Sequence, residues 1–233
     1  MKILLFGATG MVGQGVLREC LLDAGVTAVR VVGRTATGIE HDKLSELVRA
    51  DLFAYAGVEH ELSGFDACFY CLGVSSSQVS GAEYERLTYT LTLAVAGTLL
   101  RLNPAMTFLY VSGLGTDSTE RGKVAWARVK GKTENALLRM PFRAAYMLRP
   151  AGIVPMHGEV SRTPAYRLFY AVLKPLMPLL RRLMPNQFVT TVEFGQIMLA
   201  LVRRGAEKRV LESADLRADA GRLAVVENHH SAG

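Results

Sequence analysis

Three glycines near the start of the chain, Gly7, Gly10 and Gly13, stand three residues apart between an apolar run and a helical pattern. The apolar run covers residues 2–6 and is typical of a buried strand, and apolar residues recur at helical spacing over residues 11–22. Glycines in such a turn let the backbone bend tightly and approach a pyrophosphate, whose charge then faces the helix N-terminus. The spacing therefore predicts a nucleotide-binding turn that also includes Thr9, Met11 and Val12.

A second chemical signal lies at the end of the next apolar run, residues 28–32, which Gly33 and Arg34 close. An NAD enzyme places an Asp or Glu at this point to bond the ribose 2′-hydroxyl, and this sequence has no acid there. The planar guanidinium of Arg34 can pair with a 2′-phosphate instead, and Thr35 can add a hydroxyl contact. Arg34 therefore favours NADPH over NADH, with a solvated surface arginine as the alternative interpretation.

Short apolar runs alternate with helical patterns along the rest of the chain, and these elements have to position the chemical groups. We expect strands at 67–71, 107–111 and 144–148, weaker strands near 47–48 and 209–211, and helices at 83–102 and 124–139. Strands that alternate with helices imply a parallel sheet covered on both faces. The predicted fold is a single doubly wound α/β domain.

The composition excludes several classes of protein. Half of the 233 residues are hydrophobic and 21% are charged, which is too apolar for a mainly disordered chain. The net charge of +6 is scattered, so we expect no nucleic-acid partner. No uncharged apolar stretch reaches about 18 residues, and the opening lacks a signal-peptide core. We therefore expect no membrane span and a cytoplasmic location.

The three cysteines are too few for a disulfide scaffold. Cys68 and Cys71 have CxxC spacing but lie in an apolar run, whereas a redox CxxC needs a helix N-terminus to stabilise its thiolate. We interpret them as buried strand cysteines. The five histidines show no zinc-ligand spacing, so no metal is expected, and His157 is a minor candidate for a substrate contact.

These features resemble the short-chain dehydrogenase/reductase superfamily, in particular its extended and atypical NAD(P)H-binding branch. The glycine turn, Gly33 with Arg34, Asp51 with Leu52, and Lys130 carry the resemblance. The strings at 112–117 and 129–134, followed by Arg149 and Pro150, are similar to the atypical group that contains the Tat-interacting tumour-suppressor protein and its bacterial relatives. The resemblance covers roughly residues 1–212.

The resemblance implies a Rossmann-type domain and further contacts with the cofactor. Asp51 is expected to bond the adenine amino group while Leu52 packs on the ring. Leu72 and Gly73 follow the fourth strand, where family members pass the backbone beside the ribose and the nicotinamide. The segment at 149–150 is expected to close over the nicotinamide end.

In this family, hydride transfer to a carbonyl leaves an alkoxide, and a tyrosine four residues before a lysine supplies the proton. That spacing puts both side chains on one helix face. The lysine, here Lys130, lowers the pKa of that tyrosine and also binds the cofactor through the nicotinamide ribose. Lys130 is present here, but Trp126 occupies the tyrosine position, and an indole N–H cannot ionise near neutral pH. Ser112 follows the fifth strand, where the family's serine polarises the carbonyl, but relatives often carry paired serines there and this chain has one.

Three tyrosines could replace the missing acid: Tyr84, Tyr89 and Tyr110. Tyr89, on the helix before the fifth strand, is our first choice. Trp126 has two interpretations, as a hydrophobic anchor of its helix or as a pocket wall that stacks on the nicotinamide or the substrate. The predicted catalytic set is Lys130, Ser112, Trp126 and Tyr89.

An apolar segment at 166–184 lies where family members build the substrate cap, which we expect around 153–190. It contains two prolines and four basic residues, and it is too short and too charged to span a membrane. Packing as a capping helix pair, peripheral contact with a lipid surface, and contact with a second copy in a homo-oligomer all stay open. Residues 213–233 are small and polar and are expected to form a flexible tail.

The sequence thus favours an NADPH-dependent oxidoreductase that acts on a hydrophobic small molecule with Trp126 in place of the usual tyrosine. Two alternatives stay open. One is an NADP(H)-binding regulatory or scaffold protein that has lost turnover. The other is a reductase of flavins or quinones, for which a dedicated phenol is less necessary.

Overall fold

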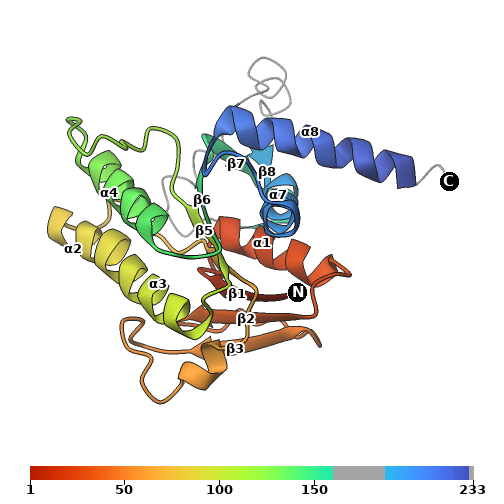
Figure 1. Ribbon diagram of the computed structural model, residues 1–233, viewed down its shortest axis with the longest axis horizontal. Coiled ribbons are helices and arrows are strands. Elements are labelled where there is room, and N and C mark those ends of the chain that lie inside the picture. The colour runs from red at the N-terminus through yellow and green to blue at the C-terminus, as the bar shows by residue number, and fades with distance from the viewer. Residues whose placement is uncertain (160–186, 231–233) are drawn as a thin grey trace.

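The computed structural model has one seven-stranded parallel sheet, in the order β3-β2-β1-β4-β5-β6-β9 (Figure 1). It describes residues 1–159 and 187–230, with the side chains of 223–230 left out. The strands are β1 (Lys2–Phe6), β2 (Ala28–Gly33), β3 (Leu44–Val48), β4 (Ala67–Tyr70), β5 (Thr107–Val111), β6 (Ala144–Arg149) and β9 (Val210–Glu212). A separate parallel pair joins β7 (Gly152–Val154) to β8 (Phe188–Thr190).

Helices cover both faces of the large sheet, as Figure 1 shows. One face packs against α1 (Met11–Leu22) and α7 (Thr191–Arg204), which also contact each other. The other face carries α2 (Gly81–Glu85), η2 (Arg86–Thr90), α3 (Leu91–Leu102) and α4 (Ala125–Arg139). The chain also has η1 (Glu59–Leu62) and α8 (Ser213–His230). This arrangement confirms the predicted doubly wound α/β fold.

Strand β1 shows why the sheet is buried on both sides. Successive side chains of a strand point to opposite faces. Ile3 and Leu5 accordingly enter the core under α1 and α7, whereas Leu4 and Phe6 enter the core under α3 and α4. All four are fully buried. A near-continuous apolar run is therefore the sequence signature of this central strand.

The strand order reverses beside β1, because β2 pairs with one edge of β1 and β4 with the other. In open α/β sheets the crevice outside the carboxyl ends of strands at such a reversal binds ligands. The glycine turn at 7–13 follows β1, and residues 71–74 follow β4. The fold therefore brings the predicted nucleotide-binding segments to one edge of the sheet.

Two elements differ from their sequence-based predictions. The helix expected at 83–102 begins at Gly81 and contains a π-helical stretch, η2, between α2 and α3. Residues 213–230 form helix α8 where we expected a flexible tail, and Leu216 and Ala220 on that helix are buried. The apolar side chains of its first turns pack against the core under α7. This packing is long-range, so the local composition of the segment does not predict it. The predicted apolar segment at 166–184 lies outside the described residues.

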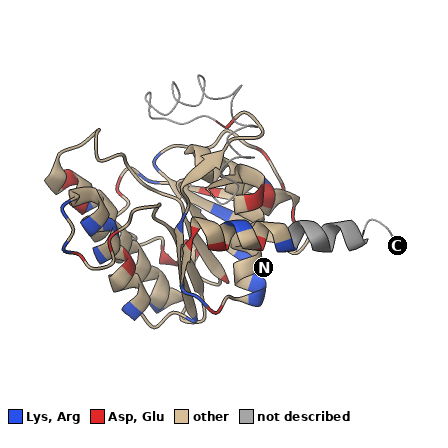
Figure 2. Cartoon of the chain, turned by 90° about the horizontal axis from the view of Figure 1, so that it is seen from above, with Lys and Arg blue, Asp and Glu red and all other residues tan. Residues whose placement is uncertain are grey.

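Charged residues of both signs are interspersed over the helices, as Figure 2 shows for the described part of the chain. Within the described ranges, no helix has the length and apolar character needed to cross a membrane. Cys68 is buried in β4 and Cys71 directly follows it, and burial raises the pKa of the Cys71 thiol to about 12. Both thiols are therefore protonated near neutral pH. The interpretation as buried strand cysteines is confirmed for Cys68, whereas Cys71 lies just past the end of β4 and is half-buried.

Candidate functional site

The glycine turn is held against the segment after β4 by two close approaches. Gly7 has a positive φ of 83°, and a Cβ there would lie 2.6 Å from the backbone of Cys71 and Leu72. A Cβ at Gly13 would lie 2.1 Å from the carbonyl oxygen of Gly7. Both glycines are therefore required by the packing of the chain itself.

Gly10 differs from the other two glycines because neither its backbone conformation nor the packing around it requires a glycine. Its φ is −85°, an ordinary extended value, and a Cβ there would have its nearest neighbour, the Gly7 carbonyl oxygen, at 3.4 Å. Any small side chain would fit this backbone without strain. The glycine instead leaves open space in front of the N-terminus of α1.

The N-terminus of α1 is suited to an anion. No side chain caps it, and its first turn contains no acid. The first amide groups of a helix, here those of Met11, Val12 and Gly13, lack intrahelical acceptors and carry the positive end of the helix dipole. Thr9 adds to the turn by accepting a hydrogen bond from Gln14 at its carbonyl oxygen, 3.1 Å away. The open space at Gly10 thus fits a phosphate group.

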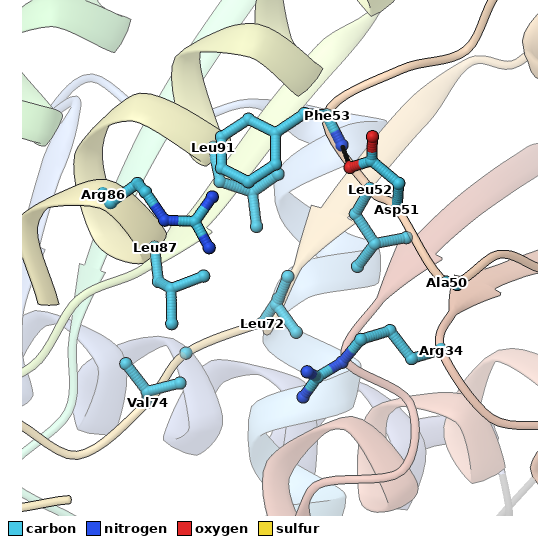
Figure 3. Close-up of a pocket in the computed structure, with 11 residues that line it drawn as sticks. Arg34, Ala50, Asp51, Leu52, Phe53, Leu72, Val74, Arg86, Leu87 and Leu91 are labelled. Carbon is cyan, nitrogen blue, oxygen red and sulfur yellow. Dashed lines mark hydrogen bonds between the residues drawn. The ribbon is translucent and has the colours of Figure 1, made fainter. Parts of the chain in front are cut away.

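A pocket of about 200 Å³ opens next to this turn, at the ends of β2, β3 and β4 (Figure 3). It is largely apolar. Leu52 is buried and Asp51 is exposed, and the Asp51 carboxylate accepts a hydrogen bond from the backbone N–H of Phe53 at 2.8 Å. The lining residues are Arg34, Ala50, Asp51, Leu52, Phe53, Leu72, Gly73, Val74, Arg86, Leu87 and Leu91. Five predicted cofactor contacts, Arg34, Asp51, Leu52, Leu72 and Gly73, are thereby brought together.

Two arginines face the pocket from different elements (Figure 3). Arg86, on η2, lies 4.9 Å above the ring of Phe53 and forms two hydrogen bonds with the Glu83 carboxylate, at 2.8 and 2.9 Å. Arg34 is exposed and forms no ion pair with any residue that the structure describes. Glu83 neutralises Arg86, so Arg34 is the cation left to meet an anionic ligand.

Lys130 lies at the same edge of the sheet, beyond the end of β5. Its Nζ donates to the backbone carbonyl of Ser112 at 2.5 Å and lies 5.9 Å from the centre of the Tyr110 ring. Burial lowers the pKa of Lys130 to about 8, and the nearby Glu134 carboxylate partly opposes that shift. The predicted pair of Lys130 and Ser112 is therefore brought together, but through the serine backbone.

The side chain of Ser112 belongs to a buried polar cluster. Its hydroxyl donates to the Glu134 carboxylate at 2.5 Å and lies 3.1 Å from the Leu148 carbonyl. Glu134 also forms a buried ion pair with Arg149, whose guanidinium reaches Glu212 at 2.8 Å. Arg149 thus has protein partners in place of the nicotinamide contact that the resemblance implies. Pro150 keeps a role at this edge, since its carbonyl accepts from the Leu114 N–H at 3.0 Å.

Trp126 and Tyr89 lie on different sides of α4. Trp126 is half-buried one turn before Lys130, and its ring lies 3.4 Å from the position of a Cβ at Gly115. The ring of Tyr89 lies 4.2 Å below the Nζ of Lys132, which pairs with Glu85. Because two residues along a helix turn it by about 200°, the structure does not bring Tyr89 to Lys130.

Sequence reasoning missed Glu134 and the pocket residues of η2. Glu134 stands one helical turn after Lys130, and that spacing was available as a signal. Its burial could not be read from the sequence, because its partner Arg149 comes from β6. Arg86, Leu87 and Leu91 reach the pocket only because α2, η2 and α3 run along this face of the sheet.

Comparison with curated proteins finds distant relatives in fungi, and no family model matches the chain. The chain is 25% identical over 176 residues to the mitochondrial protein fmp52 of Emericella nidulans, covering 73% of this chain and 74% of that protein. The mitochondrial protein FMP52-2 of Scheffersomyces stipitis is 26% identical over 172 residues, or 73% of each chain. The finer resemblance to the Tat-interacting group stays a prediction, because these comparisons do not show it.

Comparison with solved structures supports the fold. A short chain dehydrogenase family protein from Francisella tularensis superimposes with a TM-score of 0.63 at 14% identity, over 91% of this chain and 95% of that one. WbmF of Bordetella bronchiseptica, solved with NAD⁺, superimposes with a TM-score of 0.64 at 15% identity, over 96% of this chain and 78% of that one. UDP-glucose 4-epimerase from Thermotoga maritima, solved with UDP-glucose, superimposes with a TM-score of 0.64 at 15% identity, over 97% of this chain and 83% of that one. The expectation of a Rossmann-type fold is confirmed.

The expected cytoplasmic location is wrong as a default for this chain. It rested on the lack of a signal-peptide core and of a membrane span. The fungal relatives are named as mitochondrial proteins, although they match this chain over about three quarters of its length. Composition and the opening residues therefore do not decide the compartment of proteins of this kind.

Proposed function

We propose that this protein is an NADPH-dependent oxidoreductase that reduces a hydrophobic small molecule. The observation that carries the proposal is the open space at Gly10, which adjoins a pocket where Arg34 has no ion pair with a described residue. The two are continuous, because Gly7 abuts the backbone of Leu72, and Leu72 lines the pocket. A dinucleotide has the matching shape, with a diphosphate between an adenosine and a second nucleoside.

Each part of the site has a role with this cofactor. The amide groups at the start of α1 would bind the diphosphate, and Gly10 would give it room. The pocket walls formed by Leu52, Leu72 and Phe53 would hold the adenine, with the Asp51 carboxylate as an acceptor for its amino group. Arg34 would pair with the 2′-phosphate, which is what distinguishes NADPH from NADH.

The reacting end would lie toward Lys130, beyond the strands β4 and β5. When bound, the cofactor supplies hydride there. Exposed apolar side chains occur on three segments near this edge: Leu114 after β5, Val124 before α4 and Met156 after β7, each 51% exposed. Apolar surface at the rim of a site favours a hydrophobic substrate.

Binding comes first in the test of this proposal. We expect NADPH to bind more tightly than NADH in a fluorescence titration, and to be oxidised in a steady-state assay with at least one member of a panel of aldehydes, ketones and quinones. Failure to bind either nucleotide would remove the proposal. Equal binding of the two would remove the role of Arg34 and leave a nicotinamide site.

A second candidate is a protein that binds NADP(H) for regulation without turnover. The observation that favours it is the commitment of the Ser112 hydroxyl to Glu134, together with Trp126 in place of a tyrosine. Tight NADPH binding with no oxidation by any member of the panel would support this candidate against the first.

A further inference from the structure

Carbonyl reduction needs a proton donor, and the described part of the chain offers few at the edge beside Lys130. Trp126 cannot ionise near neutral pH. Tyr89 lies against Lys132 instead. Tyr110 is buried in the core, its hydroxyl bonds Thr133, and burial raises the pKa of that phenol well above its usual value. Tyr84 is buried as well.

Lys130 is placed differently from these groups. Lys130 is a half-buried residue whose Nζ lies beyond the end of β5 and donates to the Ser112 carbonyl at 2.5 Å. A carbonyl accepts one N–H and leaves the other two protons of the ammonium free to point elsewhere. The Lys130 side chain is therefore held in a fixed position and can still donate a proton.

The charges around Lys130 come from three elements. Glu134, one turn later on α4, is engaged by Arg149 of β6 and by the Ser112 hydroxyl. Tyr110 of β5 presents a neutral ring at 5.9 Å, and Tyr84 of α2 faces Tyr110. Burial lowers the pKa of the Lys130 ammonium to about 8, and Glu134, which already has a cationic partner, opposes that shift only in part. A pKa near 8 suits a general acid near neutral pH.

We propose that Lys130 itself is the general acid of this protein and donates its ammonium proton to the substrate oxygen. The inference rests on the proposed function. The carbonyl carbon gains a hydride from NADPH, which is oxidised to NADP⁺. The carbonyl π bond breaks toward oxygen, an N–H bond of Lys130 breaks, and an O–H bond forms. The resulting amine regains its proton from solvent.

The proposal has a definite pH signature. A general acid has to be protonated, so kcat/KM for carbonyl reduction should be constant below about pH 8 and fall about tenfold per pH unit above it. Reduction of a quinone, which tolerates hydride addition without an enzyme acid, should lack this fall. The two acceptors therefore separate proton donation from cofactor binding.

The test compares 4-nitrobenzaldehyde with menadione at saturating NADPH across this pH range. We expect Lys130→Met to lower aldehyde reduction by about 10²- to 10⁴-fold and to lose the fall above pH 8, with menadione reduction within about threefold of the unaltered protein. Lys130→Arg keeps a cation that does not ionise, so it should bind NADPH and behave like Lys130→Met toward the aldehyde. Lys132→Met is the matched control on the side of α4 that faces α2 and η2, and it should change neither rate.

A measurement without turnover complements the kinetics. In an NMR titration of the ¹⁵N-labelled lysine side chains, the resonance that Lys130→Arg removes should titrate near pH 8 in the free protein. A midpoint above about pH 10, the usual lysine range, would overturn the proposal.

Several kinetic outcomes would also overturn it. Aldehyde reduction retained in both Lys130 variants would show that another group donates the proton, and loss in His157→Gln would identify that group as the exposed histidine after β7. Menadione reduction without any aldehyde reduction would reject Lys130 as the acid and leave the oxidoreductase proposal standing. Reduction of neither acceptor nor of any other member of the panel, with NADPH bound, would reject both proposals.

Discussion

Arg34 and Arg86 show how two identical side chains in one pocket take different roles. Arg86 stacks on Phe53 and is neutralised by Glu83 in a two-bond ion pair. Arg34 follows β2 directly and makes no such pair within the described chain. A guanidinium without a carboxylate partner keeps its full capacity for a phosphate. Selectivity between the two nicotinamide cofactors should therefore depend on Arg34.

Arg34→Ala should remove most of the preference for NADPH. A hydrogen bond to a charged group contributes about 1.5–3 kcal/mol, which corresponds to about ten- to a hundredfold in affinity. We expect the Kd for NADPH to rise by that factor while the Kd for NADH changes little, measured by fluorescence titration. Arg143→Ala, which removes an exposed arginine before β6, is the control. An unchanged ratio of the two Kd values would assign the preference to another residue.

Trp126→Tyr should raise carbonyl reduction. Trp126 lies one helical turn before Lys130, so a tyrosine there would restore the Tyr/Lys pair of the superfamily that the sequence resembles. A phenol there would be a second proton donor beside Lys130, so we expect a rise of about tenfold in aldehyde kcat/KM, below the full contribution of about 10²–10⁴-fold from general acid catalysis. Trp126→Phe, which has no hydroxyl, is the matched control. A similar rise in both variants would mean that relief of bulk, and not the phenol, is responsible.

At the scale of elements, the three glycines of the turn have two different roles, close packing of the backbone and space for a ligand, although the sequence pattern does not distinguish them. Gly7 and Gly13 are needed where β1, α1 and the segment after β4 meet, because a Cβ would overlap backbone atoms. Gly10 has space around it and an ordinary φ. The structure of the turn thus accounts for two glycines, and a ligand is the physical reason that we propose for the third.

Gly10→Val should abolish NADPH binding and leave the fold intact. The side chain would occupy the space in front of α1, and the backbone angle of −85° is accessible to valine. We expect an unchanged circular dichroism spectrum and a thermal midpoint close to that of the unaltered protein. Gly13→Ala is the contrasting variant, because its Cβ would meet the Gly7 carbonyl and should destabilise the protein. NADPH binding retained by Gly10→Val would leave the turn with a structural role only.

At the scale of the whole molecule, one buried cluster links α4 to two strands of the sheet. Glu134 on α4 pairs with Arg149 on β6, and Arg149 also reaches Glu212 on β9. Glu134 is fully buried, whereas Glu212 is about half exposed. Because the Glu134 carboxylate also accepts from Ser112, whose carbonyl holds Lys130, this cluster sets the position of the proposed reacting end.

Glu134→Gln should destabilise the protein strongly. Removing one charge of a buried ion pair costs about 3–5 kcal/mol, and the remaining contact of Arg149 with Glu212 favours the lower end of that range. We expect the loss in the free energy of unfolding measured with urea. Glu212→Gln removes the more exposed partner and should cost less than about 1 kcal/mol. Equal losses in the two variants would contradict the assignment of Glu134 as the buried member of the cluster.

The sequence by itself determined the elements whose signals are local. The strand at 2–6, the glycine turn and the helix at 11–22 were predicted at the observed positions, because the apolar period and the glycines lie within about twenty residues. The parallel sheet and its two covered faces followed from the alternation of such elements. Arg34, Asp51, Leu52, Leu72 and Gly73 were predicted as one site, and the ends of parallel strands bring them to one pocket.

Only the tertiary structure decided which residues far apart in the sequence contact one another. Arg149 forms ion pairs with Glu134 and Glu212, and the ring of Tyr89 contacts Lys132. The packing of α4 and η2 on the sheet sets these contacts. Leu216 and Ala220 order the start of α8 by packing on the core, which the small, polar composition of that segment conceals. One physical reason accounts for the contacts of Arg149, the contact of Tyr89 and the burial at the start of α8. A side chain's burial and partners depend on residues far away in sequence, whereas helix and strand periodicity depend on near neighbours.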